Sequence, residues 1–359
     1  MTRFILLLAL LVTACAQNPK APGAGGTQVS QVATTYISTL PSRGIDYSAT
    51  LQRIAFSSCA NQDEPQPLWK TISATQPDLF LFAGDNVYAS SPYQQPIAEQ
   101  YRKLDLISEY RSLREKVPFM ATWDDHDFGM RDGGNDWAGK DAARKDFVNY
   151  WTYTRNSMPL EQGGVYHSKI IGPKKHMVQV IMLDTRYYRS SLKEKTGFEG
   201  KAMNYEPSNE GTVLGEHQWE WLETQLKRPA DVRLIVSSIQ VIAEDPPFEK
   251  WGNFPKERQR LFDLIKKTKA KNVVILSGDR HMASISKMDL PGYGALYDIT
   301  GSSINRANNY KDADRHYVGA VYNKENFGLA EIDWKRKSIK VDIRDMQNEV
   351  VNSVTIKLK

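Results

Sequence analysis

Five short polar segments of the chain carry side-chain types that bind metal ions in proteins. In chain order they are Cys59, residues 84–88 (GDNVY), residues 124–127 (DDHD), Gln240 and residues 279–281 (DRH). A thiolate and a phenolate suit trivalent iron, whereas carboxylate and amide oxygens suit hard divalent ions such as Ca²⁺, Mg²⁺ or Mn²⁺. The residue types therefore predict a centre that holds more than one kind of metal ion.

The spacing within the segments favours shared binding of an ion. Asp85 and Tyr88 are three residues apart, so a turn into a following loop or helix can bring both to one ion. Asp279 and His281 are two apart, and an extended segment points both side chains to the same side. The carboxylates of residues 124–127 repel one another unless a cation or a solvated surface relieves the repulsion. Each segment alone is also compatible with an ordinary turn or a solvated loop.

Each of these segments follows a short apolar stretch typical of a buried β-strand. The stretches are residues 53–58, 79–83, 117–123, 232–236 and 272–276. Helical patterns lie between them, at residues 67–75, 94–115, 140–153, 215–227 and 255–267. This alternation favours βαβ units around a largely parallel sheet. Because ligands bind beyond the carboxyl ends of such strands, we expect the five segments to converge at one edge.

The pattern changes after His281, where short turns separate segments that alternate like antiparallel strands. These segments are residues 283–288, 294–299, 328–334, 339–344 and 350–358. They predict a second sheet packed against the first, with the helices outside.

The N-terminal residues indicate export. Arg3 precedes an apolar run, residues 4–14, that ends in small residues before Cys15. The run is too short for a membrane span, which takes roughly 20 apolar residues. The pattern resembles a bacterial lipobox, with an ordinary secretory signal as the alternative. We expect residues 1–14 to be a signal peptide, residues 15–45 a lipid anchor and flexible tether, and residues 46–359 one folded domain. Ala16 after the anchor favours the periplasmic face of the outer membrane.

Charge and cysteine usage narrow the function. The net charge is +5, which suits anionic substrates, but Lys and Arg are scattered, so we infer no nucleic-acid partner. The chain has two cysteines, and lipidation of Cys15 would leave Cys59 without a disulfide partner. Cys59 is then either a small buried apolar residue or a metal ligand.

Seven motifs, taken together and in order, resemble the PhoD-like phosphatases, the alkaline phosphatase D group of the calcineurin-like metallophosphoesterases. They are FSSC at 56–59, GDNVY at 84–88, TWDDHDFG at 122–129, LDTRYYR at 183–189, LGEHQWEWL at 214–222, SSIQ at 237–240 and SGDRH at 277–281. The resemblance covers roughly residues 50 to 305. It implies an α/β fold, the αββα sandwich of two mixed sheets flanked by helices. It also implies Fe³⁺ with one or two Ca²⁺ ions, for which Mg²⁺, Mn²⁺ or Zn²⁺ are possible substitutes.

The same resemblance assigns metal-binding roles position by position. Cys59 and Tyr88 resemble the iron ligands, and Asp85 resembles the carboxylate that bridges two metals. Asp125 stands where the wider superfamily has a metal-binding Asn. The paired final ligands correspond to Asp279 and His281. Gln240 lies near the place of a superfamily His that this chain lacks.

Three further residues are candidates for catalysis. His126 matches the family His that contacts the substrate phosphate or the leaving group. Arg186 and Arg280 could bind phosphate, because a guanidinium group matches phosphate geometry. Arg186 could instead brace Asp184 in a structural ion pair.

The predicted reaction is metal-dependent hydrolysis of a phosphate ester, a monoester or a diester, by a metal-activated water or bridging oxygen. Loops 130–140 and 187–212 would set the width of the pocket and so distinguish these substrates. One alternative is a non-catalytic surface lipoprotein that binds metal or phosphate. Another is an enzyme of the same fold that hydrolyses sulfate or phosphonate esters.

Overall fold

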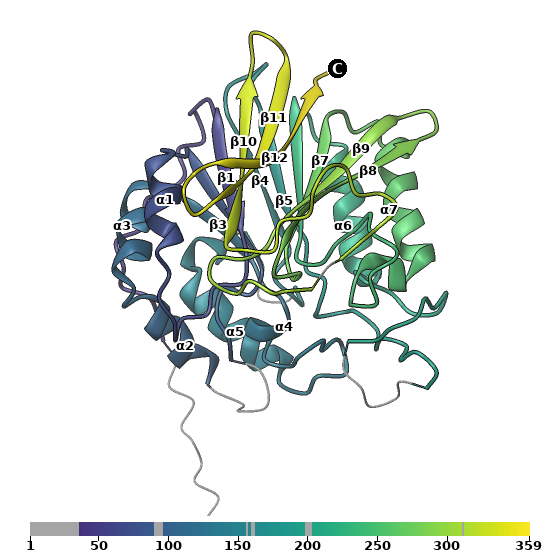
Figure 1. Ribbon diagram of the computed structural model, residues 1–359, viewed down its shortest axis with the longest axis horizontal. Helices are drawn as coiled ribbons and strands as arrows, with labels where there is room; N and C mark the ends of the chain where they lie inside the picture. Colours follow the sequence, from purple (N-terminus) through teal and green to yellow (C-terminus); the bar gives the residue numbers. More distant parts are fainter. Residues whose placement is uncertain (1–35, 90–95, 156, 159–161, 198–202, 311) are drawn as a thin grey trace, which may run out of the picture. The chain divides into compact units, whose positions relative to one another are not determined.

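Two six-stranded sheets form the centre of the computed structural model (Figure 1). The first sheet has the order β12-β11-β10-β1-β2-β3, and the second has the order β4-β5-β6-β7-β9-β8. The strands of the first are β1 (Arg53–Ser57), β2 (Leu79–Ala83), β3 (Phe119–Thr122), β10 (Asn326–Asp333), β11 (Ser338–Asp345) and β12 (Val350–Lys357). Those of the second are β4 (His167–Ile171), β5 (Val178–Met182), β6 (Val232–Ser237), β7 (Val273–Ser277), β8 (Ala283–Leu290) and β9 (Gly294–Gly301).

Both sheets are mixed, as the family resemblance implied. In the first sheet β1, β2 and β3 are parallel and β10 to β12 are antiparallel. In the second sheet β5, β6, β7 and β9 are parallel, and β4 and β8 form antiparallel edges. The predicted fold class is therefore confirmed.

The prediction from periodicity that the strands after His281 form a sheet of their own is wrong. β10 to β12 extend the first sheet beside β1, whereas β8 and β9 complete the second sheet beside β7. The parallel strands are likewise divided between the two sheets. The apolar pattern of a strand reports burial of its faces, but it does not report which neighbour forms its hydrogen bonds.

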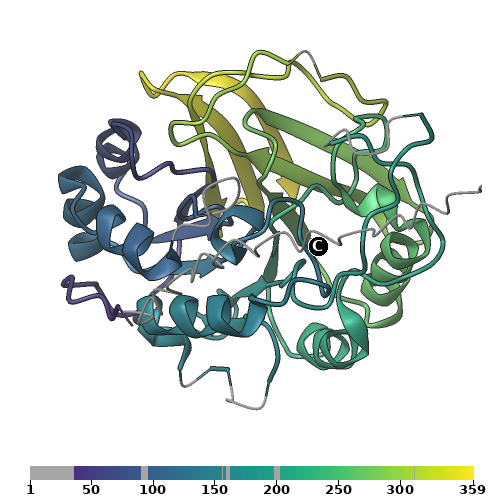
Figure 2. The ribbon, with the colours of Figure 1, turned by 90° about the horizontal axis from the view of Figure 1, so that it is seen from below.

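Helices cover the outer face of each sheet, and Figure 2 shows the layers from the end. The helices of the first layer are α1 (Leu68–Ala74), α2 (Ile97–Leu104), α3 (Ser108–Lys116), α4 (Asp125–Phe128) and α5 (Lys140–Tyr150), followed by the 3₁₀ turn η1 (Thr152–Thr154). The second layer has α6 (Gly215–Leu226), the 3₁₀ turn η2 (Trp251–Asn253) and α7 (Pro255–Lys267). Separate apolar clusters lie under each helical layer and between the sheets.

The helix predicted at residues 94–115 is divided into α2 and α3. Asp105 follows α2 and is buried, and its carboxylate accepts hydrogen bonds from the hydroxyls of Tyr36, Ser38 and Tyr150. A continuous amphipathic pattern does not reveal this break, because the partners of Asp105 are distant in sequence.

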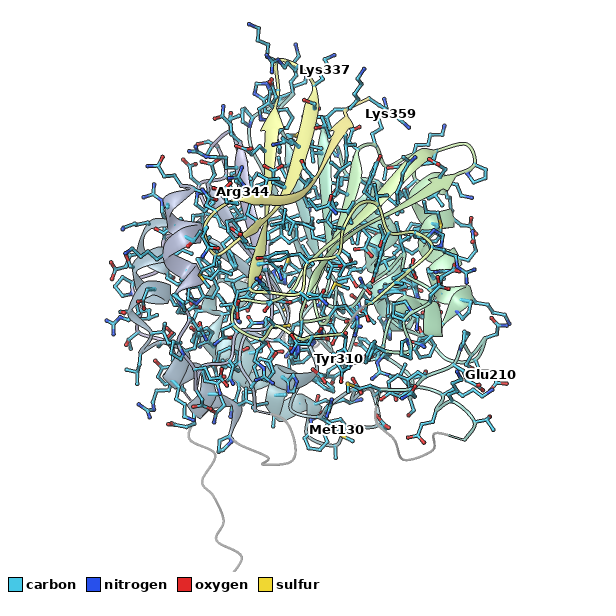
Figure 3. All side chains as sticks on the ribbon, in the orientation of Figure 1. Met130, Glu210, Tyr310, Lys337, Arg344 and Lys359 are labelled. Carbon is cyan, nitrogen blue, oxygen red and sulfur yellow. The ribbon has the colours of Figure 1, made fainter. Side chains whose placement is uncertain are left out.

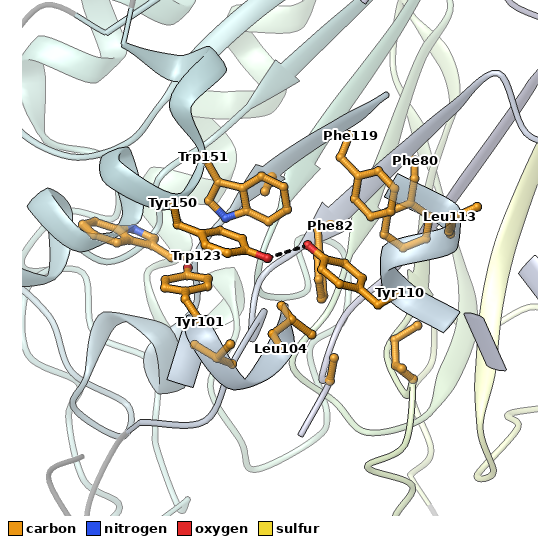
Figure 4. Packing of buried hydrophobic residues seen from close by; sticks show 14 of the residues in the cluster. Phe80, Phe82, Tyr101, Leu104, Tyr110, Leu113, Phe119, Trp123, Tyr150 and Trp151 are labelled. Atoms are coloured by element: carbon orange, nitrogen blue, oxygen red, sulfur yellow. Dashed lines mark hydrogen bonds between the residues drawn. The ribbon is translucent and has the colours of Figure 1, made fainter. Parts of the chain in front are cut away.

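Aromatic packing fixes the strands that lead to the polar segments (Figure 4). Phe80 of β2 and Phe119 of β3 have ring centres 4.7 Å apart. The hydroxyls of Tyr110 and Tyr150 lie 3.0 Å apart in the same cluster. Large buried rings contribute roughly 0.5–1.5 kcal/mol per pair beyond burial of their area, so this pair helps to hold β2 and β3 in register.

The structure describes residues 36–359 except 90–95, 156, 159–161, 198–202 and 311. The described residues form one compact unit. The predicted signal peptide and Cys15 lie outside the described residues. Tyr36 and Ser38, at the end of the predicted tether, are bound to Asp105 of this unit. Within the described ranges, no helix combines the length and apolar character needed to span a bilayer.

Candidate metal centre

Four of the five polar segments converge between the two sheets. Cys59 follows β1 and Asp85 follows β2, and the two loops are joined by a hydrogen bond of 3.0 Å from the Ala60 amide to the Asp85 carbonyl. His126 lies in α4 after β3, and His281 follows β7 of the second sheet. The carboxyl ends of strands from both sheets therefore contribute to one site, whereas the sequence predicted that the segments meet at the edge of a single sheet.

The backbone at four predicted ligands is left-handed. The φ angles are 62° at Cys59, 49° at Asp85, 68° at Asp279 and 55° at His281. Non-glycine residues adopt this conformation rarely, at a cost of order 1 kcal/mol or more, and such residues cluster at functional sites. The expectation of an extended segment through Asp279 and His281 is wrong. Tight turns, not strand alternation, bring these side chains to the site.

The first group of potential ligands contains Cys59, Asp85 and His281. One ligand atom from each lies within 4.8 Å of the other two. The Cys59 thiol donates to Asp85 Oδ2 over 3.4 Å. The Tyr88 hydroxyl donates to the same oxygen over 3.2 Å and lies 3.0 Å from His281 Nε2. Thiol, phenol, carboxylate and imidazole thus surround one small volume.

The second group contains Asp85, Asp125 and His126, again with ligand atoms within 4.8 Å of one another. Asp85 belongs to both groups, which is the position expected of a bridging carboxylate. Asp125 Oδ1 is buried and accepts no hydrogen bond within the described residues. A bound cation would satisfy this oxygen.

The carboxylates of residues 124–127 have separate roles. Asp124 Oδ1 pairs with Arg186 and accepts a hydrogen bond of 2.6 Å from the Ser238 hydroxyl. Asp127 accepts hydrogen bonds from the backbone amides of Asp124 and Asn86. Asp125 faces the cavity. Of these three carboxylates, only Asp125 lines the cavity, and it is therefore the one best placed to bind a metal ion there.

The site is a cavity of about 70 Å³. Its lining includes Asp85, Asp125, His126, Asp279 and His281. The structure thus places Asp279 in the same cavity, although its carboxylate belongs to neither close group of ligands.

Burial and mutual repulsion make this cluster unfavourable when all its groups are charged. Burial, with the charges of neighbouring aspartates, raises the pKa of Asp85 and of Asp279 well above the usual range. Burial and the nearby Asp85 also raise the pKa values of Cys59 and Tyr88. Burial, with the charge of Arg306, lowers the pKa of His281 to about 3. Cations in the cavity would offset these effects, so the donor set fits a metal centre.

The predicted phosphate-binding arginines lie in different environments. Arg280 lines the cavity. Arg186 is fully buried, does not belong to the lining, and pairs with Asp124 Oδ1 at 2.5 Å and Glu249 Oε2 at 2.6 Å. The alternative that Arg186 braces Asp184 is wrong in its partner. Asp184 Oδ1 accepts hydrogen bonds from the backbone amides of Arg186 and Tyr187, and not from the Arg186 guanidinium group.

Gln240 lies apart from the other segments. Its side-chain amide is buried and donates to the hydroxyls of Thr300, Ser284 and Tyr317, at 2.9, 3.2 and 3.2 Å. It does not line the cavity. The expectation that all five segments converge is therefore wrong for Gln240, which instead crosslinks β8 and β9.

Several lining residues were not predicted individually. Loops 130–140 and 187–212 were expected to shape the pocket, and they supply Arg131, Asp132 and Met203. Two loops without a prediction supply Phe248, Glu249, Asn308 and Tyr310. Figure 3 labels Met130, the neighbour of Arg131 in the chain, and Tyr310 at the lower centre of the view. These loops follow the carboxyl ends of β3, β5, β6 and β9, but the lining residues lie well beyond the strand ends, so no strand-end signal marked them.

A family model described as PhoD-like phosphatase matches residues 54–347. The chain belongs to this family. Alkaline phosphatase D of Bacillus subtilis (strain 168) is 24% identical over 341 residues, which cover 80% of this chain and 56% of that protein. The chain thus spans just over half the length of this curated relative.

Solved structures agree on the fold. The structure of PhoD matches with 18% identity and a TM-score of 0.67, covering 89% of this chain and 70% of that one. A purple acid phosphatase from yellow lupin (Lupinus luteus) seeds gives 12% identity and a TM-score of 0.59, covering 88% and 55%. A dimetal phosphatase from Danio rerio gives 12% and 0.57, covering 87% and 100%. The fold is of the metallophosphoesterase type, which implies divalent metal cofactors.

Proposed function

We propose that this chain is a phosphoric ester hydrolase that uses a multinuclear metal centre. The observation that carries the proposal is the position of Asp85, whose carboxylate belongs to both groups of potential ligands. A carboxylate between two cations is suited to a site that clamps the attacking and leaving oxygens of a phosphoryl group. Membership in the PhoD-like phosphatase family points to the same chemistry.

The proposed metals are Fe³⁺ and one or two Ca²⁺ ions, with Mg²⁺, Mn²⁺ or Zn²⁺ as possible substitutes. Cys59, Tyr88 and His281 would hold the iron, because thiolate, phenolate and imidazole suit it. Asp125 and Asp279 would bind Ca²⁺ through their carboxylate oxygens. Asp85 would be shared between the two.

Bound metal ions would supply Lewis acidity and lower the pKa of a bound water. The chain's own residues would bind and orient the ester. The guanidinium group of Arg280 is suited to a phosphate oxygen. Burial lowers the pKa of His126, so its imidazole is neutral near pH 7 and would donate a hydrogen bond, rather than a proton, from its ring N–H to the leaving oxygen. Arg186 would act indirectly, by fixing Asp124 beside Asp125.

The substrate is a phosphate monoester or diester. The ionisable groups of the cavity surround the position proposed for the phosphoryl group, and the organic part of the substrate would lie toward the aromatic part of its lining. Phe248 and Tyr310 stand there with ring centres 5.4 Å apart. They are suited to contact that organic part.

We also propose that the chain is an exported lipoprotein, anchored through Cys15 on the periplasmic face of the outer membrane. The support is the apolar run of residues 4–14 before Cys15. In this proposal residues 1–14 are removed, residues 15–45 carry the anchor and tether, and residues 46–359 form the hydrolase domain.

The test combines elemental analysis with activity on p-nitrophenyl phosphate and on its bis-ester, before and after chelation. We expect bound iron and calcium, loss of hydrolysis on chelation, and recovery when metals return. A preference for one of the two esters assigns the substrate class. Undiminished hydrolysis by thoroughly metal-free protein would refute the proposal.

A further inference from the structure

Arg280 lines the cavity but is not one of the potential metal ligands, so the metal centre does not explain its contacts. It stands between Asp279 and His281, and only 5% of it is exposed. A buried guanidinium group is unfavourable unless it is paired and hydrogen-bonded. Its contacts therefore decide what it can bind.

Two residues from separate loops hold the guanidinium group. Arg280 Nη2 donates to Asp312 Oδ2, and the side chain of Asp312 is only 6% exposed. The ring of Phe248 lies under the guanidinium carbon, at 3.9 Å from its centre. In addition, the side-chain amide of Asn308 donates to the Arg280 carbonyl over 2.7 Å.

These contacts leave part of the group unsatisfied. Arg280 Nε is buried and has no hydrogen-bond partner among the residues that the structure describes. Arg280 Nη1 is 3.9 Å from Oδ2 of Asp279, too far for a hydrogen bond. Asp312 thus balances the charge of the Arg280 guanidinium group and fixes its orientation. The remaining N–H donors of Arg280 can bind an anion in the cavity.

We propose that Asp312 and Phe248 are positioning residues that hold Arg280 ready to bind an oxygen of the substrate phosphate. The ion pair restricts rotation of the guanidinium group, and the ring restricts its tilt. The inference rests on the proposed function, because it assigns to these residues a part in the binding of phosphate. It also gives a role to the two contacts that Asn308 and Asp312 make with Arg280.

The test measures the binding of inorganic phosphate by calorimetry, together with kcat and KM, for the metal-loaded protein. Asp312→Asn keeps the shape of the side chain but removes its charge. We expect its dissociation constant for phosphate to rise about tenfold, as for the loss of one charge-assisted hydrogen bond. KM should rise more than kcat falls. Asp312→Glu should recover part of the affinity, and Phe248→Leu should lose about threefold.

A double-mutant cycle shows whether Asp312 acts through Arg280. In an Arg280→Gln background, Asp312→Asn should change phosphate affinity no further, because the group that it orients is gone. Additive effects would overturn the proposal, as would wild-type affinity in Asp312→Asn.

A matched control separates positioning from stability. Asp342 is buried and paired with Arg344 at 2.8 Å, and it does not line the cavity. Asp342→Asn should lower the melting temperature without changing phosphate affinity. An equal loss of affinity in this control would overturn the positioning role. A wild-type protein that binds no phosphate and hydrolyses no ester would overturn the proposed function as well. Wild-type affinity in Asp312→Asn and Phe248→Leu would overturn only the positioning role.

Discussion

At the scale of single residues, Asp85 belongs to both groups of potential metal ligands. Its Oδ2 accepts from the Cys59 thiol and the Tyr88 hydroxyl, and its Oδ1 accepts the His126 amide over 3.2 Å. Burial raises its pKa well above the usual range, and Asp125 adds to this effect. A carboxylate in that position is stable as an anion only beside cations.

Replacement of Asp85 by Asn should therefore abolish metal loading and activity together. We expect the metal content to fall to a minor fraction and turnover to fall more than about 100-fold, since a neutral amide cannot bridge two cations. Elemental analysis and an ester-hydrolysis assay measure both. Asp298→Asn, at another buried carboxylate that lies outside the cavity lining, should keep its metals. Wild-type metal content in Asp85→Asn would contradict the bridging role.

Arg186 should prove to be a stability residue. Its guanidinium group neutralises Asp124 and Glu249, all of them buried. Arg186→Met leaves two buried carboxylates with less compensation, and we expect a loss of about 3–5 kcal/mol in unfolding free energy. Denaturant titration measures this loss. A variant of normal stability with impaired phosphate binding would instead favour direct contact with the substrate.

At the scale of elements, the turns that follow the strands place the polar side chains of the site. Gly84, between β2 and Asp85, has a φ angle of +97°. A Cβ atom there would lie 2.6 Å from Asp124 Cβ and 2.9 Å from Ser238 Cβ. The absent side chain lets the loops after β2, β3 and β6 pack closely.

Gly84→Ala should consequently destabilise the protein and loosen the site. We expect a loss of more than about 2 kcal/mol in unfolding free energy, from backbone strain and overpacking together, with weaker metal retention during dialysis. Gly44→Ala is the control, since nothing lies within 4 Å of its added Cβ. A Gly84→Ala protein as stable as the control would show that the turn is not constrained.

At the scale of the whole molecule, the buried acids make stability depend on pH. In the metal-free protein the pKa values of Asp85, Asp127 and Asp279 are raised by burial. Such groups stabilise the folded state while they stay protonated, and the contribution is lost as pH rises toward their folded pKa values. The lowered pKa of His281 acts in the opposite sense, but only below its unfolded value near 6.5.

Between about pH 6.5 and pH 8 the carboxylates therefore set the trend, since the pKa of Asp124 is also raised, to about 7, and the lowered pKa of Lys250, about 8, acts in the opposite sense only at higher pH. We expect the melting temperature of metal-free protein to fall between about pH 6.5 and pH 8, while that of the metal-loaded protein changes little, because bound cations would hold the same groups ionised in the folded state. Thermal melts with and without chelator across this range measure the difference. A metal-free protein that gains stability with rising pH would contradict the prediction.

The proposed anchor also belongs to this scale. Cys15→Ala should move the protein from the membrane fraction to the soluble fraction of the cell envelope, because the proposed lipid would be attached to that thiol. Cell fractionation with immunodetection measures the shift. Cys59→Ala is the control, since Cys59 is buried in the folded unit and should not affect membrane attachment. Retention of Cys15→Ala in the membrane would contradict lipidation at this residue.

The sequence by itself determined the chemical types in the site and the strand ends that present them. Cys59, Asp85, Asp125 and His281 were identified because each follows an apolar stretch, and this signal is local. The mixed αββα fold followed from a resemblance of motifs rather than from periodicity.

Tertiary structure alone decided which strands share a sheet, which of residues 124–127 faces the cavity, and which loops close its mouth. Asp124 accepts a hydrogen bond from Arg186, which is 62 residues away in the sequence. Asp312 accepts one from Arg280, which is 32 residues away. The left-handed turns at Asp279 and His281 also arise from these surroundings. Local patterns report burial and backbone preference, whereas pairing between distant charges depends on a register that only the packed sheets establish.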